Sequence, residues 1–564
     1  MKKIFCSLLL AAIAFSVAAQ SPLKGKIMVL DFGTAVGERS GSGMSLSLSG
    51  LSSNKTVSLL SIERALDAAA KDDKVAMVFL KTDRFSGGPA TAEELRHSLE
   101  RFRKAGKPVV SYATHYDASG YYLASVADKV VMNPSGEGEL IGMSTLNYYL
   151  GDLLDTLGIQ MQLIRHGKYK SAGEPFIRGE MSAENREQYE VLLRSVWNAR
   201  MAEVAASRKV SVADLDAWVD GLALDRAQSW HEKGLVDELW HKGEMEAWLC
   251  AQFGVAKPEL LRTVDAADYA AKLKKGPAKN KVAVVYANGS IGEGSDIDGE
   301  KMAHEIAKVR ADSTVKVIVF RVNSQGGAVL SSDLIRREVT EAQKVKPVVA
   351  SYGSYAASGG YWISSSADRI FTDNTTLTGS IGVFGLIPAL GPAIRKNLKV
   401  NMVSVGTHAH SDLGQGMRPL DEQEKAWMQK SVDNTYDQFV SLVAESRKLE
   451  KDFVESIAQG RVWAGTDALR LGLADERGTL LDAIEYAARL KGLDQYRIVL
   501  YPEEKSMSLR DLLRGPRKDD EPLVRVELPA ALQQQAAVLE EVTRLAGPDL
   551  RPATYARMPF MELR

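Results

Sequence analysis

Lys346-Pro347-Val348-Val349-Ala350-Ser351-Tyr352 is the stretch that decides the fold, because nearly the same residues occur once before in the chain. Lys107-Pro108-Val109-Val110-Ser111-Tyr112 precedes it by 239 residues at its start and by 240 at its end. Two further pairs match at an offset of 240, namely Gly120-Tyr121 with Gly360-Tyr361 and Ala127-Asp128 with Ala367-Asp368. A repeat of this length indicates two copies of one unit, so the chain is predicted to be a tandem duplication.

Each copy is predicted to be an α/β unit. In the first copy, β-prone apolar runs at residues 26–32, 75–80 and 109–112 alternate with helical patterns at 61–70 and 92–103. This alternation is typical of βαβ units and a largely parallel sheet. Helical extensions are expected at 183–208 and 422–447, and the Gly/Ser-rich residues 37–55 are expected to form a loop.

The N-terminus has the pattern of an export signal. Lys2-Lys3 precedes an apolar stretch over residues 4–17, and Ala18-Ala19-Gln20 supplies small residues for cleavage near Ala19. The stretch is shorter than the roughly 20 residues of a membrane span, although a retained signal anchor is the alternative. We therefore predict the following division: 1–19 signal peptide or short anchor, 20–255 N-terminal half, 256–280 linker, 281–500 C-terminal half and 501–564 tail.

Composition excludes several classes of function. The net charge of -1 gives no basic surface for nucleic acid. Cys6 and Cys250 are the only cysteines, so a disulfide framework or a thiolate metal site is not expected. The eight histidines are scattered without His-Glu-x-x-His spacing, which argues against a zinc hydrolase. No metal and no cofactor is predicted.

The second half contains candidates for a nucleophile and for its oxyanion donors. Thr378-Gly379-Ser380-Ile381-Gly382 follows a β-prone run and would hold the Ser380 hydroxyl tightly at a turn. Asn323-Ser324-Gln325-Gly326-Gly327 ends another buried run, and such a glycine pair can expose consecutive N–H groups to an oxyanion. At the repeat offset Leu140 falls on Ser380, so the first half lacks the hydroxyl.

The base is expected to come from the first half. Residues 165–176 form a polar stretch that contains Lys170, with Lys168 as a nearby alternative. A lysine has a pKa of about 10.4 and serves as a base at neutral pH only when burial lowers that pKa. Apolar neighbours from the second half would supply the burial, so the interface between the halves would be part of the site.

Tyr169-Lys170-Ser171-Ala172 and Glu174-Pro175-Phe176, taken with the Ser380 and glycine-pair motifs, resemble the signal peptide peptidase A (protease IV) family of the long, duplicated type. The resemblance implies a crotonase- or Clp-like fold in each half and a serine protease with a Ser/Lys dyad. Ser380 would be the nucleophile, Lys170 the general base, and the N–H groups of Gly326, Gly327 or Ile381 the oxyanion donors.

The same resemblance implies the biological setting. The enzyme would be a membrane-associated homotetramer on the periplasmic side of the inner membrane in the cell envelope, where it would degrade cleaved signal peptides through an acyl-enzyme. Val383 and Phe384, next to the serine, are candidates for an apolar substrate site. The chain departs from the family where Gln325 and Ala328 replace the usual proline and serine around the glycine pair.

Several alternatives stay open at this point. Ser380 could cap a helix, or it could act with His410 and Asp412 as a triad. Ser404 is a possible third partner for the lysine amine. At the level of function, a crotonase-like acyl-CoA enzyme would share the fold, and a non-catalytic envelope scaffold is suggested by the half that lacks its serine.

Overall fold

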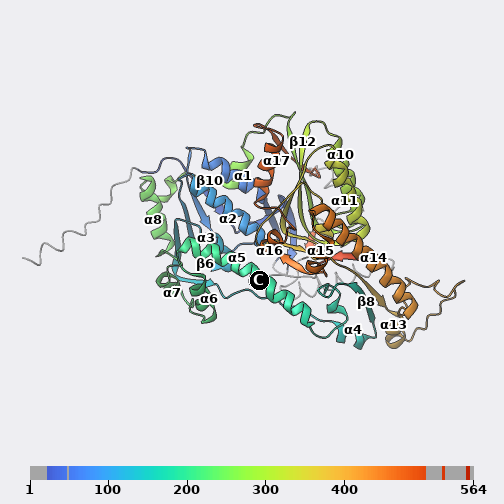
Figure 1. Cartoon of the computed structure of the whole chain (residues 1–564). Coiled ribbons are helices and arrows are strands. Elements are labelled where there is room, and N and C mark those ends of the chain that lie inside the picture. The colour runs from blue at the N-terminus through green and yellow to red at the C-terminus, as the bar shows by residue number, and fades with distance from the viewer. Residues whose placement is uncertain (1–21, 48–49, 504–523, 527–553, 559–564) are drawn as a thin grey trace, which may run out of the picture.

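The computed structural model describes residues 22–47, 50–503, 524–526 and 554–558. The predicted signal segment and most of the predicted tail lie outside these residues. Figure 1 shows two α/β units side by side, the first in blue to green and the second in yellow to red. Among the described residues, no helix is long and apolar enough to cross a membrane.

The first unit is built on a parallel sheet of six strands. Its strands in spatial order are β10 (Thr263–Asp265), β1 (Lys26–Asp31), β5 (Val75–Lys81), β6 (Val109–Asp117), β7 (Lys129–Glu139) and β9 (Glu238–Leu239). Helices α1 (Leu59–Ala70), α2 (Pro89–Lys104) and α3 (Ala118–Ala124) connect them. A parallel sheet is covered on both faces, which explains why its strands are continuous apolar runs.

The second unit repeats this strand order. Its corresponding path runs through β19 (Arg497–Tyr501), β11 (Lys281–Ile291), β12 (Val315–Ala328), β13 (Val348–Ala357), β14 (Arg369–Thr372) and β18 (Glu476–Arg477). Strand β15 (Leu377–Gly379) pairs in parallel with the end of β13, and β16 (Val383–Ala389) follows β15 in the chain. The predicted tandem duplication of an α/β unit is therefore confirmed by the topology of the sheets.

The helical extensions have the predicted bounds. They are α5 (Ala183–Arg208) in the first unit and α14 (Glu422–Arg447) in the second. The side chains of Ser182 and Asp421 accept hydrogen bonds from the first turns of these helices, as N-cap residues do. The other helices are α4 (Gly151–Leu157), α6 (Val212–Asp220), α7 (Ala227–Glu232), α8 (Lys242–Phe253), α9 (Ala266–Ala271), α10 (Gly299–Ala311), α11 (Val329–Gln343), α12 (Gly359–Trp362), α13 (Gly391–Leu398), α15 (Lys451–Ile457), α16 (Gly465–Arg470) and α17 (Leu480–Leu490).

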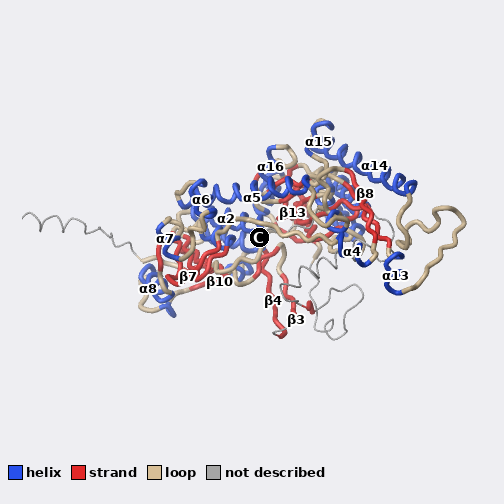
Figure 2. Tube along the Cα trace, turned by 90° about the horizontal axis from the view of Figure 1, so that it is seen from below, coloured by secondary structure: helices blue, strands red, loops and turns tan. Residues whose placement is uncertain are grey.

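Two stretches differ from the sequence expectation. Most of the described residues in the range 37–55, expected to be a loop, instead belong to β2 (Ala35–Gly37), β3 (Gly41–Ser47) and β4 (Gly50–Ser58), and Figure 2 shows β3 and β4 projecting from the body. Residues 256–280, expected to be a linker, contribute β10 and α9 to the first unit. The glycine and serine content of residues 37–55 did not predict strands there, because pairing in a hairpin overrides the weak β propensity of these residue types.

The two units are tied together by strands and by a buried ion pair. Strand β8 (Gln160–His166) leaves the first unit and pairs antiparallel with β16 of the second. Arg321 of β12 is buried and donates to Glu38 at 2.8 Å and 3.0 Å, and it also binds Glu94 of α2. Because β8 leads directly into the Lys170 loop, the pairing of β8 with β16 carries that loop across to the second unit.

Candidate active site

Ser380 occupies a strained turn between β15 and β16. It has φ +48°, a left-handed conformation that few non-glycine residues adopt. Its N–H donates to the carbonyl of Arg461 at 2.7 Å, and the side chain is fully buried. Strain of this kind persists where the surrounding structure holds the residue, and it is concentrated at functional sites.

Lys170 reaches this serine from the first unit. Its Nζ lies 3.0 Å from Ser380 Oγ, 2.7 Å from Ser358 Oγ and 3.0 Å from the carbonyl oxygen of Ser380. The side chain is fully buried, and this burial alone holds the pKa of the Lys170 amine well below its usual value of 10.5. The structure thus places a desolvated amine against a serine hydroxyl.

Two glycines make room for the Lys170 side chain. Gly460 has φ +77°, and a Cβ added there would lie 2.6 Å from the Lys170 Cβ. A Cβ on Gly382 would lie 3.1 Å from Lys170 Cδ. The loop also docks through its backbone, because the N–H of Tyr169 donates to the carbonyl of Gln459 at 2.9 Å. Larger residues at either glycine would displace the amine.

The Lys170 loop is braced from its own unit by buried polar contacts. Glu174 accepts from Ser182 Oγ at 2.8 Å and from Arg165 at 2.8 Å. Ser171 Oγ donates to Asn185 Oδ1 at 2.7 Å. These partners lie at the end of β8 and the start of α5, so the strand that crosses to the second unit and the helix that follows the loop together orient the lysine.

Ser358 is the site residue that the sequence analysis missed. It has φ +56°, precedes α12, and donates its N–H to the carbonyl of Gly379 at 2.8 Å. The sequence contains a signal for it, because at the repeat offset Ala118 falls on Ser358 just as Leu140 falls on Ser380. Both hydroxyls that contact Lys170 are therefore absent from the first copy.

The glycine pair lies at the end of β12. Gly326 has φ +99°, and its N–H donates to Ser324 Oγ at 3.1 Å. A Cβ on Gly327 would lie 1.8 Å from the carbonyl oxygen of Ile291, so only glycine fits there. Ile381 follows Ser380 and is buried, and its carbonyl accepts from Gly460 at 2.8 Å. These three residues remain candidates for oxyanion donors.

Val383 and Phe384 do not present their side chains as a substrate surface. Both are fully buried, Val383 in the main core of the second unit and Phe384 in a cluster with Leu154 and Phe176. Phe384 pairs through its backbone with Arg165 of β8 and with Tyr555 of β21 (Thr554–Arg557), a strand near the C-terminus. Strand β16 is therefore paired through its backbone on both sides.

The alternative triad is not assembled. His410 Nδ1 lies 2.9 Å from Glu424 Oε1, a hydrogen bond that raises the pKa of His410, while Asp412 binds Arg418 at 2.7 Å. Ser404 lies in an exposed segment, and the second hydroxyl at the lysine belongs to Ser358 instead.

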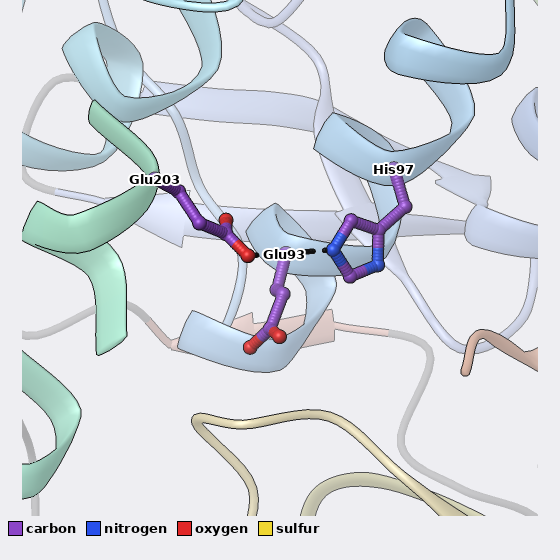
Figure 3. A group of neighbouring side chains, drawn as sticks. All are labelled: Glu93, His97 and Glu203. Carbon is purple, nitrogen blue, oxygen red and sulfur yellow. Dashed lines mark ion pairs between the residues drawn. The ribbon is translucent and has the colours of Figure 1, made fainter. Parts of the chain in front are cut away.

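Two side-chain groups among the described residues have the composition of a metal site. Figure 3 shows His97 of α2 directed at Glu203 of α5, with Glu93 of α2 beside them. Arg477 already binds all three, including Glu93 at 3.0 Å. The second group, His410 with Asp421 and Glu424, is bound by Arg418, which lies 2.7 Å from Glu424. In each group a guanidinium already supplies the positive charge that a metal ion would bring.

Comparison with known proteins decides the family. The model of peptidase family S49 matches twice, at residues 101–255 and 340–494. The chain belongs to peptidase family S49. This S49 peptidase is 36% identical to "Protease 4" of Salmonella typhi, over 84% of this chain and 78% of the relative. It is 32% identical to "Protease 4" of Haemophilus influenzae, over 88% and 84%.

A plant relative and a solved structure complete the comparison. The S49 peptidase is 33% identical to "Serine protease SPPA, chloroplastic" of Arabidopsis thaliana, over 82% of this chain and 70% of the relative. The solved structure of ClpP1 from Listeria monocytogenes covers 36% of this chain and 94% of its own, at 17% identity and a TM-score of 0.24. The family and its relatives identify the chain as a serine protease.

Proposed function

We propose that this serine protease cleaves peptides with Ser380 as nucleophile and Lys170 as general base. The observation that carries the proposal is the 3.0 Å contact between Lys170 Nζ and Ser380 Oγ at a fully buried site. A neutral amine has two N–H donors and one lone pair. If Ser358 Oγ and the Ser380 carbonyl accept the two donors, the lone pair faces the Ser380 hydroxyl.

The reaction would proceed in two stages. Ser380 Oγ attacks the peptide carbonyl while its proton passes to Lys170, which then returns a proton to the leaving amine. Lys170 next takes a proton from a water molecule that attacks the acyl-enzyme ester, and it returns that proton to Ser380 Oγ as the ester C–O bond breaks. The oxyanion would be held by backbone N–H groups beside the serine, from Gly326 or Gly327 and from Ile381. Ser358 is a positioning residue, since it acts through the lysine.

Mutation of each proposed residue tests this mechanism. Ser380→Ala and Lys170→Ala should each abolish hydrolysis of a fluorogenic peptide with an apolar P1 residue, while Lys168→Ala, an exposed lysine of the same loop, should not. A variant that keeps full activity would remove that residue from the mechanism. A serine-directed acylating probe that labels wild type and not Ser380→Ala would exclude a scaffold, and inactivity toward acyl-CoA would exclude the crotonase alternative.

We further propose that the substrates are cleaved signal peptides and other short peptides in the cell envelope. Support comes from the export pattern at the N-terminus and from the family resemblance, and the bacterial relatives named "Protease 4" fit an envelope protein. Incubation of the enzyme with synthetic signal peptides and with a folded protein tests this. Cleavage of the folded protein at an equal rate would contradict the preference for short peptides.

The predicted homotetramer also becomes a proposal, in which chains join head to tail. In one chain β8 pairs with β16. The repeat counterpart of β8, residues 400–406, has no assigned strand partner among the described residues, and Val403 and Val405 are 85% and 94% exposed. Pairing of residues 400–406 with the next chain at each contact would close a ring. Val405→Lys should then yield monomers in sedimentation experiments.

A further inference from the structure

The strand β21 lies where a peptide substrate would be expected to bind. It pairs antiparallel with the end of β12, where Gly326 faces Arg557 and Gly327 faces Ala556. On its other side it pairs antiparallel with β16, where Phe384 faces Tyr555. A segment from the end of the chain thus fills the position between the candidate oxyanion glycines and the strand that follows Ser380.

The direction of β21 is that of a substrate approaching the nucleophile. Continuing its register with β16 brings Met558 opposite Ile381, the neighbour of Ser380. On the β12 side, the N–H of Met558 donates to the carbonyl of Gln325 at 2.8 Å, directly before Gly326. Residues of β21 therefore run toward Ser380 in the N-to-C direction, which places Met558 at the position of a P1 residue.

The register also divides the roles of the two glycines. In an antiparallel ladder, residues two apart along a strand make the same kind of pair. Because Gln325 and Met558 form a hydrogen-bonded pair, Gly327 and Ala556 form the next one. Gly326 lies between them and directs its N–H away from the peptide strand. The Gly326 N–H, which donates to Ser324 Oγ, is therefore turned away from the bound strand, whereas the Gly327 backbone faces it.

The side chain of Met558 is fully buried beside the dyad. It packs in an apolar cluster, called here the Met558 cluster, that includes Ala357, which precedes Ser358, and Leu377, which begins β15. The remaining buried members come from α5 and β17 (Val462–Ala464): Tyr189, Leu192, Val196, Val462 and Ala464. An unbranched, flexible thioether suits a site of this kind.

We propose that residues 554–558 are a built-in pseudosubstrate that competes with peptides for the strand position between β12 and β16. The residue after Met558 is Pro559. Proline has no N–H, and its ring carbon Cδ restricts the backbone of the preceding residue. The bond after Met558 therefore has a crowded tertiary nitrogen as its leaving group, so the segment binds in the substrate direction and resists cleavage.

Peptide binding tests the competition without relying on catalysis. In the Ser380→Ala background, a fluorescein-labelled peptide Thr-Tyr-Ala-Arg-Met, which copies residues 554–558, is titrated against the full chain. If the internal segment is docked in about nine of ten molecules, Met558→Asp should bind the peptide about tenfold more tightly than the parent chain. Met561→Asp, three residues further on, is the matched control and should bind like the parent. Equal affinity in all three chains would overturn the proposal.

A second experiment tests the register and rests on the proposed function. Pro559→Ala replaces the resistant bond by an ordinary secondary amide. Ser380 Oγ would attack the carbonyl carbon of Met558, the C–N bond would break with a proton passing from Lys170 to the nitrogen, and water would hydrolyse the ester. Intact mass spectrometry should show loss of residues 559–564 from Pro559→Ala and none from Pro559→Ala with Ser380→Ala.

The two experiments separate the possible failures. If wild type cleaves an added peptide while Pro559→Ala keeps its full mass, the placement of Met558 at P1 is refuted. If neither wild type nor Met558→Asp cleaves an added peptide, the proposed function fails, and the binding result still decides whether residues 554–558 compete.

Discussion

Replacing Lys170 by methionine should make the protein more stable at neutral pH, and the gain should shrink as the pH rises. Burial lowers the pKa of the Lys170 amine well below 10.5 in the folded chain. Between the lowered pKa of the folded chain and pH 10.5 the unfolded chain therefore binds up to one more proton than the folded chain, so wild-type stability rises with pH across this range. This dependence amounts to about 1.4 kcal/mol per pH unit while the folded amine stays neutral.

Urea unfolding of wild type and Lys170→Met at pH 8 and pH 9 measures this effect. Methionine nearly conserves volume, and the loss of contacts with Ser358 and Ser380 is the same at both pH values, so it cancels. The gap between the two unfolding free energies should narrow by about 1.4 kcal/mol from pH 8 to pH 9. Lys168→Met, with its exposed side chain, should keep the pH dependence of wild type. A gap for Lys170→Met that is equal at the two pH values would refute the reasoning that burial holds this amine neutral.

Three further substitutions test the surroundings of the dyad. Ser358→Ala removes the 2.7 Å acceptor of Lys170 and should lower kcat about 10- to 100-fold with KM unchanged, as the loss of a buried hydrogen bond costs about 1–3 kcal/mol. Gly460→Ala should abolish hydrolysis, because its Cβ would lie 2.6 Å from Lys170 Cβ, while the circular dichroism spectrum of the folded protein is retained. Gly492 is the control: it also has a positive φ, but a Cβ there would meet nothing within 4 Å, so Gly492→Ala should stay active. Arg321→Ala leaves two buried carboxylates unpaired and should lower the unfolding free energy by about 3–5 kcal/mol, seen as a lower Tm.

The sequence predicted the architecture because the repeat and the hydrophobic periodicity are both local signals. The bounds of α5 and α14 were predicted to the residue, since each has a polar cap followed by a sustained 3.6-residue pattern. The β3 and β4 hairpin was missed because its strands are rich in glycine and serine, and only their mutual pairing stabilises them.

The site was predictable only as far as motifs reach. Ser380 and Lys170 were proposed from their flanking residues, and the structure brings them together across 210 residues of chain. Ser358 was missed because a serine before two glycines has no distinctive pattern until the two copies are compared. The placement of residues 554–558 was missed because β21 depends on pairing with β12 and β16, which no local pattern in these residues indicates.

The pairing of β8 with β16 has a consequence for how activity depends on dilution. Both residues of the dyad, and the strand that carries one to the other, belong to a single chain. The rate per chain should therefore be independent of protein concentration even where an assembly dissociates. A duplicated enzyme of this kind holds lysine and serine in one chain, so a fixed intramolecular contact replaces what could be a bimolecular encounter between them.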